Sequence, residues 1–470
     1  MTLYKHKNPM RSHSFILSAA AISLCLGLSS CGIYSKYHAK DEVADDLFGQ
    51  DYASTDGDTT TIADIRWQEL FTDSYLQGYI RQALEQNTDY LTALEKVKEA
   101  EATLLSAKLA YLPSLSFSPT GTASSWNHGK ATQTYSIPVT ASWEIGLFGS
   151  LRNARKQSKA LLAQSKDYEQ AVHAAVISNV ANIYYTLLML DDQLRLTQES
   201  EKAWSETVRS ARALMAAGQY NEAGVAQLEA SWYSVQTSVA DMLESINQTE
   251  NAFALILAET PRHYERGTLA NQQFTDRYDI GVPLQILRNR PDVRQAERAL
   301  EAAFYSTNSA RSALYPNITL SGSAGWSNSS GSGIVNPGKL LASATASLTQ
   351  PLFQQGKLLG QLKIAKAQQE EARLAFEQTV LEAGSEVNDA LTALQTARAK
   401  TDLLRQQVEA LDRALRSTSL LMEYGSTTYL EVLTARQTLL SAQLSETANK
   451  ATEIQSLITL YQALGGGGVD

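Results

Sequence analysis

The sequence contains almost no cysteine. Among its 470 residues there are two, Cys25 and Cys31. Both lie near the N-terminus, where three basic residues precede an apolar run over residues 15–28 and two small residues follow it. This order of basic, apolar and small segments is typical of a secretory signal. We therefore expect residues 1–30 to be a signal peptide that the mature protein lacks.

Cys31 ends a short motif with its own chemistry. The tetrapeptide Leu28-Ser29-Ser30-Cys31 resembles the bacterial lipobox, in which the cysteine becomes the acylated first residue. Gly32 follows where an aspartate would indicate retention in the inner membrane, so this resemblance favours the outer membrane. The alternative is an ordinary cleaved signal with an incidental cysteine. A lipid on Cys31 would leave the mature chain without a thiol, which excludes disulfide bonds, thiolate metal sites and cysteine catalysis.

The chain also has too few basic residues for a nucleic-acid partner. Its 40 Lys and Arg residues stand against 49 Asp and Glu residues. The signal holds three bases and no acid, so the mature net charge is 37 − 49 = −12. No segment of the sequence supplies a clustered basic face, which nucleic-acid binding requires.

Catalytic and metal-binding motifs are missing as well. The histidines outside the signal show no HExxH or paired metal spacing, and we interpret each as a solvated or loop residue; they are His38, His128, His173 and His263. The carboxylates of Asp191-Asp192 lie on a helical face, where we expect them to be solvated. Glycines 465–468 are not followed by the Gly-Lys-Ser/Thr of a phosphate loop. The sequence therefore predicts no enzyme, no metal site and no cofactor beyond the lipid on Cys31.

Proline is absent from two long tracts, residues 151–217 and 357–424. In both tracts apolar residues recur at alternating spacings of four and three, as in a coiled coil. These residues are Val176, Val180, Ile183, Leu187, Leu190 and Leu194 in the first tract, and Leu404, Val408, Leu411 and Leu415 in the second. A helix of about 67 residues extends roughly 100 Å, so its apolar stripe requires neighbouring helices. Each tract ends at a glycine, Gly218 or Gly425, which suits a helix C-terminus and a tight reversal.

Outside the signal, no run supplies about 20 apolar residues, so we expect no transmembrane helix. Four short segments instead alternate apolar and polar residues: 135–145 and 318–326 without a break, and 114–126 and 341–352 more weakly. This alternation is typical of outer-membrane strands, and a soluble hairpin with one buried face is the alternative. Two hairpins cannot close a barrel, and lipid does not tolerate open sheet edges, so a membrane sheet would require further subunits.

The chain is rich in internal repetition. Residues 87–90 correspond to residues 290–293 at an offset of 203, and Gly218 corresponds to Gly425 at an offset of 207. Because the offset changes by only four residues between these positions, we expect two copies of one structural unit.

The repeat predicts a mainly α fold with a small β part and the following organisation. Residues 31–62, polar and acidic, form an acylated tether. The first repeat, 63–265, contains a helix over about 74–111, a β-hairpin over about 114–146, the long helix, a tip turn near 218 and a return helix. The second, 266–470, contains a helix over about 290–313, a hairpin over about 316–353, the long helix, a tip turn near 425, a return helix and a glycine-rich tail.

Residues 288–297, RNRPDVRQAE, resemble the RRPDIRxAE-type segment of TolC-like outer-membrane efflux proteins. Further matches to the lipoprotein branch of that family lie at residues 67–73, Asn87, Asp89, 314–316, 425–436 and 463–467. The resemblance covers essentially the whole mature chain. It implies a homotrimer in the outer membrane, with four strands per subunit in one twelve-stranded barrel and the helices in a hollow periplasmic cylinder. It also implies two partners, a periplasmic adaptor and an inner-membrane resistance-nodulation-division pump.

The resemblance further implies a gate at the periplasmic tips, near Gly218 and Gly425. Relatives often place an acidic residue there, in an LDAQ-type segment, whereas this chain has Thr434 at that position and Glu431 one turn earlier. We therefore expect a different constriction, formed with Tyr429 or Glu431. The alternative for Glu431 is a solvated helix residue.

The family motif itself is interpreted as structural. Its charged residues, Arg290 and Asp292 among them, are expected to cap and salt-bridge the start of the helix at Pro291, a favoured first-turn residue, with Ala296 and Glu297 further along that helix.

The function that follows is a passive exit duct for small toxic compounds, the outer-membrane channel of a tripartite efflux pump. Two alternatives remain open from the sequence: an exit duct for type I polypeptide secretion and a non-conducting coiled-coil scaffold of the envelope. No motif in the chain identifies the transported substrate.

Overall fold

The computed structural model describes Tyr37 and residues 62–125, 127–129, 131–272, 274, 289–328 and 339–468. The expected signal peptide and Cys31 lie outside the described residues, as does nearly all of the expected tether.

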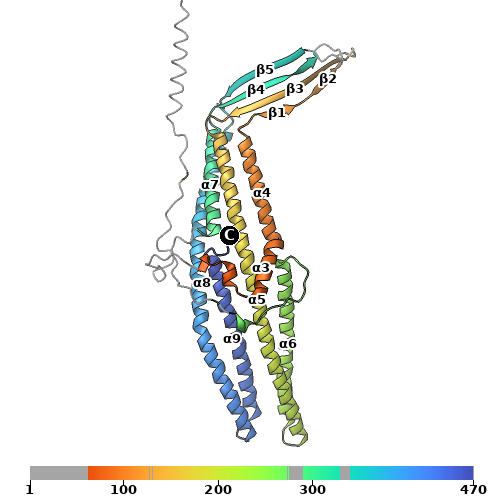
Figure 1. Ribbon diagram of the computed structural model, residues 1–470, viewed down its shortest axis with the longest axis vertical. Helices are drawn as coiled ribbons and strands as arrows, with labels where there is room; N and C mark the ends of the chain where they lie inside the picture. Colours follow the sequence, from red (N-terminus) through yellow and green to blue (C-terminus); the bar gives the residue numbers. More distant parts are fainter. Residues whose placement is uncertain are drawn as a thin grey trace, which may run out of the picture. The chain divides into compact units, whose positions relative to one another are not determined.

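Six of the described helices form three pairs of equal length; Figure 1 labels all six. The two intermediate helices are α4 (Thr88–Leu109) and α7 (Pro291–Ser312), 22 residues each. The two long helices are α5 (Ser150–Ala216) and α8 (Lys357–Glu423), 67 residues each. The two return helices are α6 (Glu222–Ile256) and α9 (Tyr429–Ala463), 35 residues each.

The remaining elements are short. Before α4 lie η1 (Ile62–Asp64), α2 (Trp67–Leu70) and α3 (Ser74–Gln86), and η2 (Leu269–Asn271) follows α6. The strands are β1 (Ser114–Phe117), β2 (Thr120–Ser124), β3 (Thr132–Ile145), β4 (Asn317–Asn328) and β5 (Lys339–Thr349).

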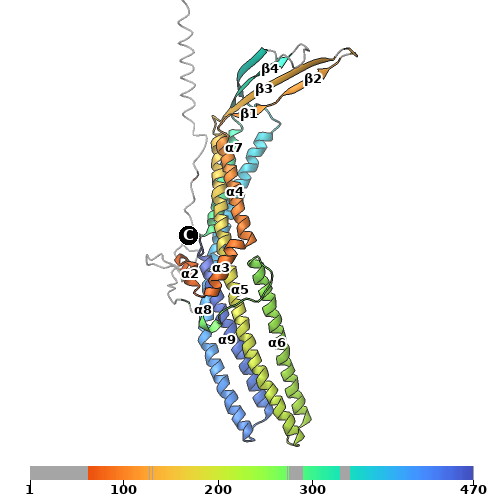
Figure 2. The ribbon, with the colours of Figure 1, turned by 45° about the vertical axis from the view of Figure 1, so that its right-hand side comes forward.

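The chain divides into two compact units. The sheet unit comprises the strands and the adjoining helix ends, within Ala107–Lys156 and Phe304–Ala367. The helical unit comprises the rest of the described helices, within Asp41–Ser106, Gln157–Ala303 and Gln368–Asp470. In the helical unit α5 runs beside α6 and α8 beside α9, as both views show (Figures 1 and 2).

The expected helix over 74–111 is interrupted at Asn87. The Asn87 side chain accepts hydrogen bonds from the backbone N–H groups of Asp89 and Tyr90 and donates one to the Ile256 carbonyl, at 2.9–3.0 Å. An asparagine in this position caps a new helix, because its side chain satisfies amides that have no intrahelical partner. The prediction of one continuous helix was therefore wrong, and Asn87 starts α4.

The sheet is antiparallel, in the order β1/β2, β3, β4, β5. β1 and β2 pair with β3 in one uninterrupted register, since Phe117 lies opposite Val139 and Thr120 opposite Ser136. The gap between them contains Pro119, and the facing strand contains Pro138. Proline donates no ladder hydrogen bond, so the first of the four expected strands is divided into two segments.

The register separates two chemically different faces. β3 and β4 pair Ile145 with Ile318, Trp143 with Leu320, Val139 with Ala324 and Ile137 with Trp326. The alternate pairs, such as Ser142 with Ser321 and Thr140 with Ser323, are hydroxylic. Within this chain the apolar face is not covered: Leu115, Phe117, Val139, Trp143, Trp326, Leu340 and Leu348 are all exposed.

The core of the helical unit surrounds Tyr184 and Tyr185 of α5, which are at most 1% exposed. The ring of Tyr79 lies 5.1 Å from that of Phe253, and Phe253 lies 4.9 Å from Tyr264. These edge-to-face contacts join α3, α6 and the segment after α6, since aromatic rings favour such geometry.

One described helix, α5, is long and apolar enough by composition to cross a membrane. Its most apolar 18-residue window has a mean hydropathy of 1.2, and 61% of that window is buried inside the protein. A core helix of a soluble bundle has the same properties. The absence of a membrane-spanning helix stays a prediction.

The pairing of β3 with β4 depends on Gly325, which lies opposite Pro138. A Cβ on Gly325 would lie 2.3 Å from the Ile137 carbonyl oxygen, whereas one on Gly322 would meet its nearest atom at 3.5 Å. We expect Gly325→Ala to lower the stability of the sheet by about 1–3 kcal/mol, because the strands must move apart. Gly322→Ala is the control. Thermal unfolding of both variants in detergent checks this, and equal melting temperatures would contradict it.

Candidate functional site

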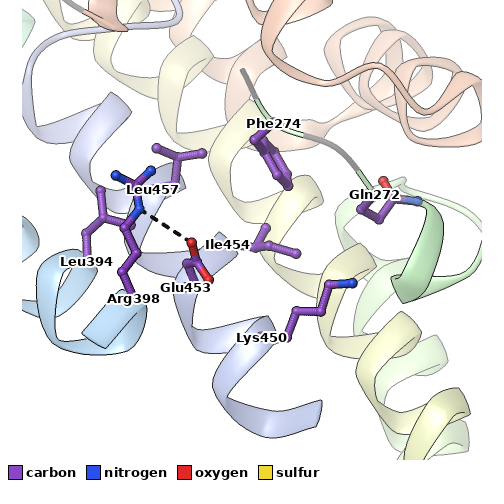
Figure 3. Close-up of a pocket in the computed structure, with 8 residues that line it drawn as sticks. All are labelled: Gln272, Phe274, Leu394, Arg398, Lys450, Glu453, Ile454 and Leu457. Atoms are coloured by element: carbon purple, nitrogen blue, oxygen red, sulfur yellow. Dashed lines mark ion pairs between the residues drawn. The ribbon is translucent and has the colours of Figure 1, made fainter. Parts of the chain in front are cut away.

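The first candidate is a cavity of about 390 Å³ beside α8 and α9 (Figure 3). Phe274, Ile454 and Leu457 supply apolar lining. Its charged groups are already partly paired, since Arg398 Nε lies 3.4 Å from Glu453 Oε1. Among the described residues no group of three His, Cys, Asp or Glu side chains could hold a metal ion. This cavity supplies neither a nucleophile with its base nor a metal centre.

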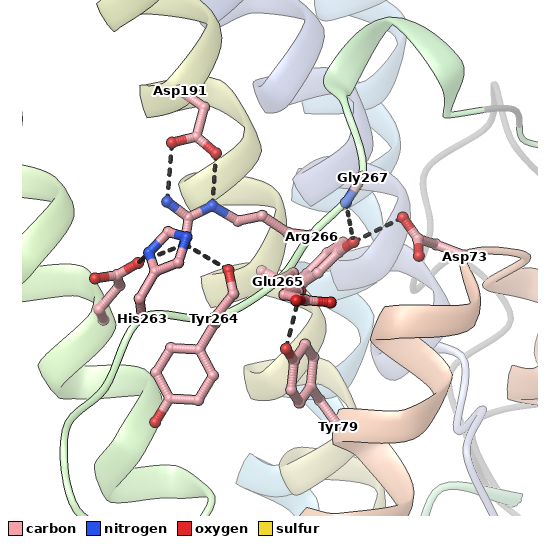
Figure 4. Close-up of polar contacts among 10 residues, drawn as sticks. Asp73, Tyr79, Asp191, His263, Tyr264, Glu265, Arg266 and Gly267 are labelled. Carbon is pink, nitrogen blue, oxygen red and sulfur yellow. Dashed lines mark hydrogen bonds and ion pairs between the residues drawn. The ribbon is translucent and has the colours of Figure 1, made fainter.

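The most heavily charged buried cluster fixes the segment that follows α6 (Figure 4). The Arg266 side chain is 6% exposed. It donates to both carboxylate oxygens of Asp191, at 2.5 and 2.9 Å, and to Glu250 at 2.6 Å. Burial opposes the charged form, but these two carboxylates outweigh it and raise the pKa of Arg266. The Asp191 side chain is 38% exposed, so the expectation that it is solvated holds in part. What was not predicted is that it also neutralises a buried guanidinium.

A second set of hydrogen bonds holds the next residue of the same segment. The Gly267 N–H donates to the Tyr184 hydroxyl at 2.9 Å, and that hydroxyl donates to Asp73 Oδ2 at 2.7 Å. Asp73 also caps α3 by accepting from the Tyr75 N–H. The start of α3, the middle of α5 and the segment after α6 are thus held together, which indicates a structural rather than catalytic cluster.

The histidines differ in their environments. His173 is buried, and its Nδ1 lies 2.8 Å from the Gly467 carbonyl oxygen of the glycine-rich tail. The prediction that it is solvated or in a loop was wrong, since it lies on α5 and packs against that tail. His263, in contrast, has an exposed side chain, with Nδ1 2.9 Å from Glu250.

The family motif lies where α7 meets α8 and α9. Arg290 donates to Asp292, to Glu386 and to the Ala463 carbonyl, at 2.6–3.0 Å. Burial opposes its charge, but the hydrogen bonds to Asp292 and Glu386 prevail and raise the pKa of Arg290. The Asp292 carboxylate also accepts from the Val293 N–H.

α7 begins at Pro291, one residue after Arg290. Ala296 and Glu297 lie in its second turn and are partly exposed. The hydrogen bonds of Arg290 join the start of α7 to α8 and α9. Arg290 and Glu386 also line a cavity of about 580 Å³ beside these helices.

The two tips have the same backbone geometry. Gly218 and Gly425 adopt φ of 74° and 71°. The N–H of each glycine bonds to the carbonyl three residues earlier, and the next N–H bonds to the carbonyl five residues earlier, at 2.8–3.0 Å. This is the Schellman motif, which terminates a helix and needs a residue that tolerates positive φ.

The residues after the two glycines differ. In the first tip the Asn221 side chain caps α6 by accepting from the Gly224 N–H at 2.7 Å. In the second tip Thr428 makes no side-chain cap, and the Thr427 hydroxyl donates instead to Glu431. Glu431 and Thr434 are exposed in this chain, and the Thr434 hydroxyl bonds to the Leu430 carbonyl of its own helix.

Tyr429, by contrast, links the two tips. Its ring lies 4.9 Å from the ring of Tyr220 in the first tip. We call α5–α6 and α8–α9 the two helical hairpins. Both tyrosines pack against an apolar cluster of the α5–α6 hairpin, whose buried members are Trp204, Val208, Ala211, Val225, Leu228 and Val235. The ring of Tyr220 also requires Gly224, because a Cβ there would lie 2.5 Å from the tyrosine oxygen. Tyr429 was predicted as a tip residue from the sequence, whereas Tyr220 was not, because its partner lies in the other half of the chain.

Arg436 makes a second contact between the hairpins. Its guanidinium lies 5.8 Å from the Trp204 ring, and Nη1 donates to the Thr207 hydroxyl at 3.3 Å. Among the described residues it has no ion-pair partner. Burial lowers its pKa, and the nearby charge of Glu206 opposes that shift. Arg436 is half-buried, and its described contacts are the Trp204 ring and the Thr207 hydroxyl rather than a carboxylate.

Comparison with known proteins identifies the chain's relatives. A family model described as outer membrane efflux protein matches residues 79–259 and again residues 282–466. The chain belongs to this family. Its members are outer-membrane components of efflux pumps, and they work with partner proteins and form trimers.

Individual members of the family are similar over most of their length. The cation efflux system protein CusC of Escherichia coli (strain K12) is 27% identical over 405 residues, 85% of this chain and 88% of CusC. The solvent efflux pump outer membrane protein SrpC of Pseudomonas putida is 28% identical, over 89% of this chain and 91% of SrpC. The crystal structure of the open state of the Neisseria gonorrhoeae MtrE outer membrane channel has a TM-score of 0.83 at 28% identity, covering 93% of this chain and 98% of that one.

These findings confirm three predictions: the family, the outer-membrane location and the function as the outer-membrane channel of a tripartite efflux pump. The outer membrane efflux relatives are transport channels rather than enzymes. The mainly helical fold with a small sheet is that of the family.

The Arg266 cluster gives a testable consequence for stability. We expect Arg266→Met to lower the stability of the helical unit by about 3 kcal/mol, because buried Glu250 would lose its permanently charged partner and keep only His263. Arg262→Met is the matched control. Arg262 also pairs with a glutamate, Glu259, but its side chain is 53% exposed. Loss of that ion pair should therefore lower stability by less than about 1 kcal/mol. Thermal unfolding followed by circular dichroism measures both, and equal shifts would contradict the assignment.

Proposed function

We propose that three copies of this chain form one conduit, in which the sheets close a shared twelve-stranded barrel across the outer membrane and the helices form a hollow periplasmic cylinder. β1/β2 and β5 are the edge strands of the sheet. Lipid offers no hydrogen-bond partner to an open edge, so the edges must pair with other subunits. Four strand positions per chain, β1 and β2 counting as one, give twelve in a trimer.

The distribution of apolar side chains supports this assembly. The exposed apolar face of the sheet is suited to lipid, and Trp143 and Trp326 lie near opposite ends of it, as the aromatic residues of membrane barrels do. Along α8 the coiled-coil positions Leu404, Val408, Leu411 and Leu415 are only half-buried. Leu243 and Leu255 of α6 are at least 50% exposed. These helices thus retain apolar surface for neighbouring subunits.

An internal duplication accounts for the equal helix lengths. The three pairs of helices match in length, and the family model matches each half separately. Two similar halves per subunit would give a trimer six near-equivalent helical hairpins around one pore.

The conduit is passive and gated at its periplasmic tips. A periplasmic adaptor and an inner-membrane resistance-nodulation-division pump would supply contact and energy, and small toxic compounds would leave through the open duct. The observation that carries the gate is the contact of Tyr220 with Tyr429, supported by Arg436 on Trp204. These contacts hold the helical hairpins α5–α6 and α8–α9 of one subunit together. Breaking them would let the two hairpins separate and widen the tip.

The gate is tested by conductance of the purified protein in planar bilayers. We expect Tyr220→Ala and Tyr429→Ala each to raise the open probability about tenfold or more, since an aromatic pair contributes about 0.5–1.5 kcal/mol and a trimer has three. Tyr424→Ala is the control, because Tyr424 lies in the same tip and is 83% exposed. No conductance in any variant would contradict the conduit, and equal conductance of all three would contradict the gate.

The lipid on Cys31 is a separate proposal, which rests on the lipobox. We expect the wild-type chain to incorporate labelled palmitate in cells and Cys31→Ser to incorporate none, because the thiol is the acylated atom. The Cys25→Ser variant, altered within the signal, is the control. Equal labelling of the wild type and Cys31→Ser would contradict the assignment.

A further inference from the structure

The polar face of the sheet has an unusually uniform chemistry. By register it carries the alternate positions of every strand, from Ser114 and Ser116 on β1 to Ser347 and Thr349 on β5. Most are serine or threonine, with Pro138, Gly325 and Leu341 among the exceptions. Several bond across strands, as Ser116 does with Thr140 and Ser323 with Ser343, at 2.6–2.7 Å. This face is hydrophilic but carries little charge.

Glu144 is the exception. Among the described side chains of the polar face it is the only carboxylate, and it lies opposite Thr319, one residue before the end of β3. Its side chain is exposed, and its carboxylate makes no hydrogen bond or ion pair with a described residue. The other ionisable residue that the register assigns to this face, Lys339, lies opposite Ser327. Thr319 and Ser327 are eight residues apart on β4, roughly 26 Å, so salt screens these positions from each other.

We propose that Glu144 sets the charge preference of the barrel. This inference rests on the proposed trimeric conduit, in which three copies of Glu144 form a ring on a wall that consists mostly of hydroxyl side chains, with Lys339 near its other end. Rings of carboxylates enrich cations and repel anions in pores. The barrel therefore favours cationic and zwitterionic amphiphiles over anionic ones, and its remaining wall offers hydrogen bonds to solutes of any charge.

The first test is the reversal potential across a potassium chloride gradient, measured in the Tyr429→Ala background so that the tip is open. We expect Glu144→Gln to lower the permeability ratio of potassium to chloride about twofold or more, and Glu144→Asp to retain the wild-type ratio. Thr319→Glu, which adds a carboxylate at the facing position, should raise it. An unchanged ratio in Glu144→Gln would overturn the proposal while leaving the conduit intact. Absence of any current would overturn the conduit and this inference with it.

The second test uses the expected lack of free thiols and needs no open gate. In the Thr319→Cys variant the thiol lies opposite Glu144, and in Ser323→Cys it lies on the same face roughly 13 Å further along β4. The measured quantity is the rate of modification by a cationic methanethiosulfonate reagent divided by the rate for an anionic one. We expect this ratio to be about threefold or more higher for Thr319→Cys than for Ser323→Cys. Adding Glu144→Gln should abolish this difference. A difference that persists without the carboxylate would overturn the proposal.

Discussion

Apolar surface without a partner inside the chain is the constraint on which this protein depends. The sheet exposes one complete apolar face, and the long helices retain half-buried coiled-coil positions over much of α8. In water both would be costly, at about 25 cal/mol for each Å² of apolar surface left uncovered. In the proposed conduit, lipid covers the apolar face of the sheet and neighbouring helices cover the coiled-coil positions. Members of the outer membrane efflux family form trimers, which is consistent with this arrangement.

Much of the fold follows from local rules that a sequence displays directly. The long helices lack proline and carry heptad spacing, so their extent could be predicted to within a few residues. Gly218 and Gly425 end them because the Schellman geometry requires positive φ. The strands follow from alternation, and their pairing places apolar residues opposite apolar residues because a register shift of one would reverse the faces.

What could not be predicted depends on contacts between distant segments. Arg266 pairs with Asp191, 75 residues away, and His173 with Gly467, 294 residues away. Tyr220 and Arg436 acquire their roles only because the two hairpins lie together. The cap at Asn87 could have been predicted, because asparagine is a favoured N-cap residue whose side chain accepts from the N–H groups two and three residues later. The strong helical periodicity on either side concealed it.

The distribution of charge on the polar face of the sheet is relevant to how proteins of one fold can transport different compounds. Relatives of similar length are named for the efflux of cations, solvents and antibiotics. A wall of serine and threonine hydroxyls can donate to or accept from any of these solutes, so the barrel imposes no specific recognition. A single carboxylate position then changes the electrostatic potential of the wall without altering its packing, because Glu144 is exposed and supports no other residue. Charge preference in the proposed barrel is thus separable from the packing of this chain, whereas substitution of Arg266 or Arg290 would lower its stability because each pairs with carboxylates at a buried site.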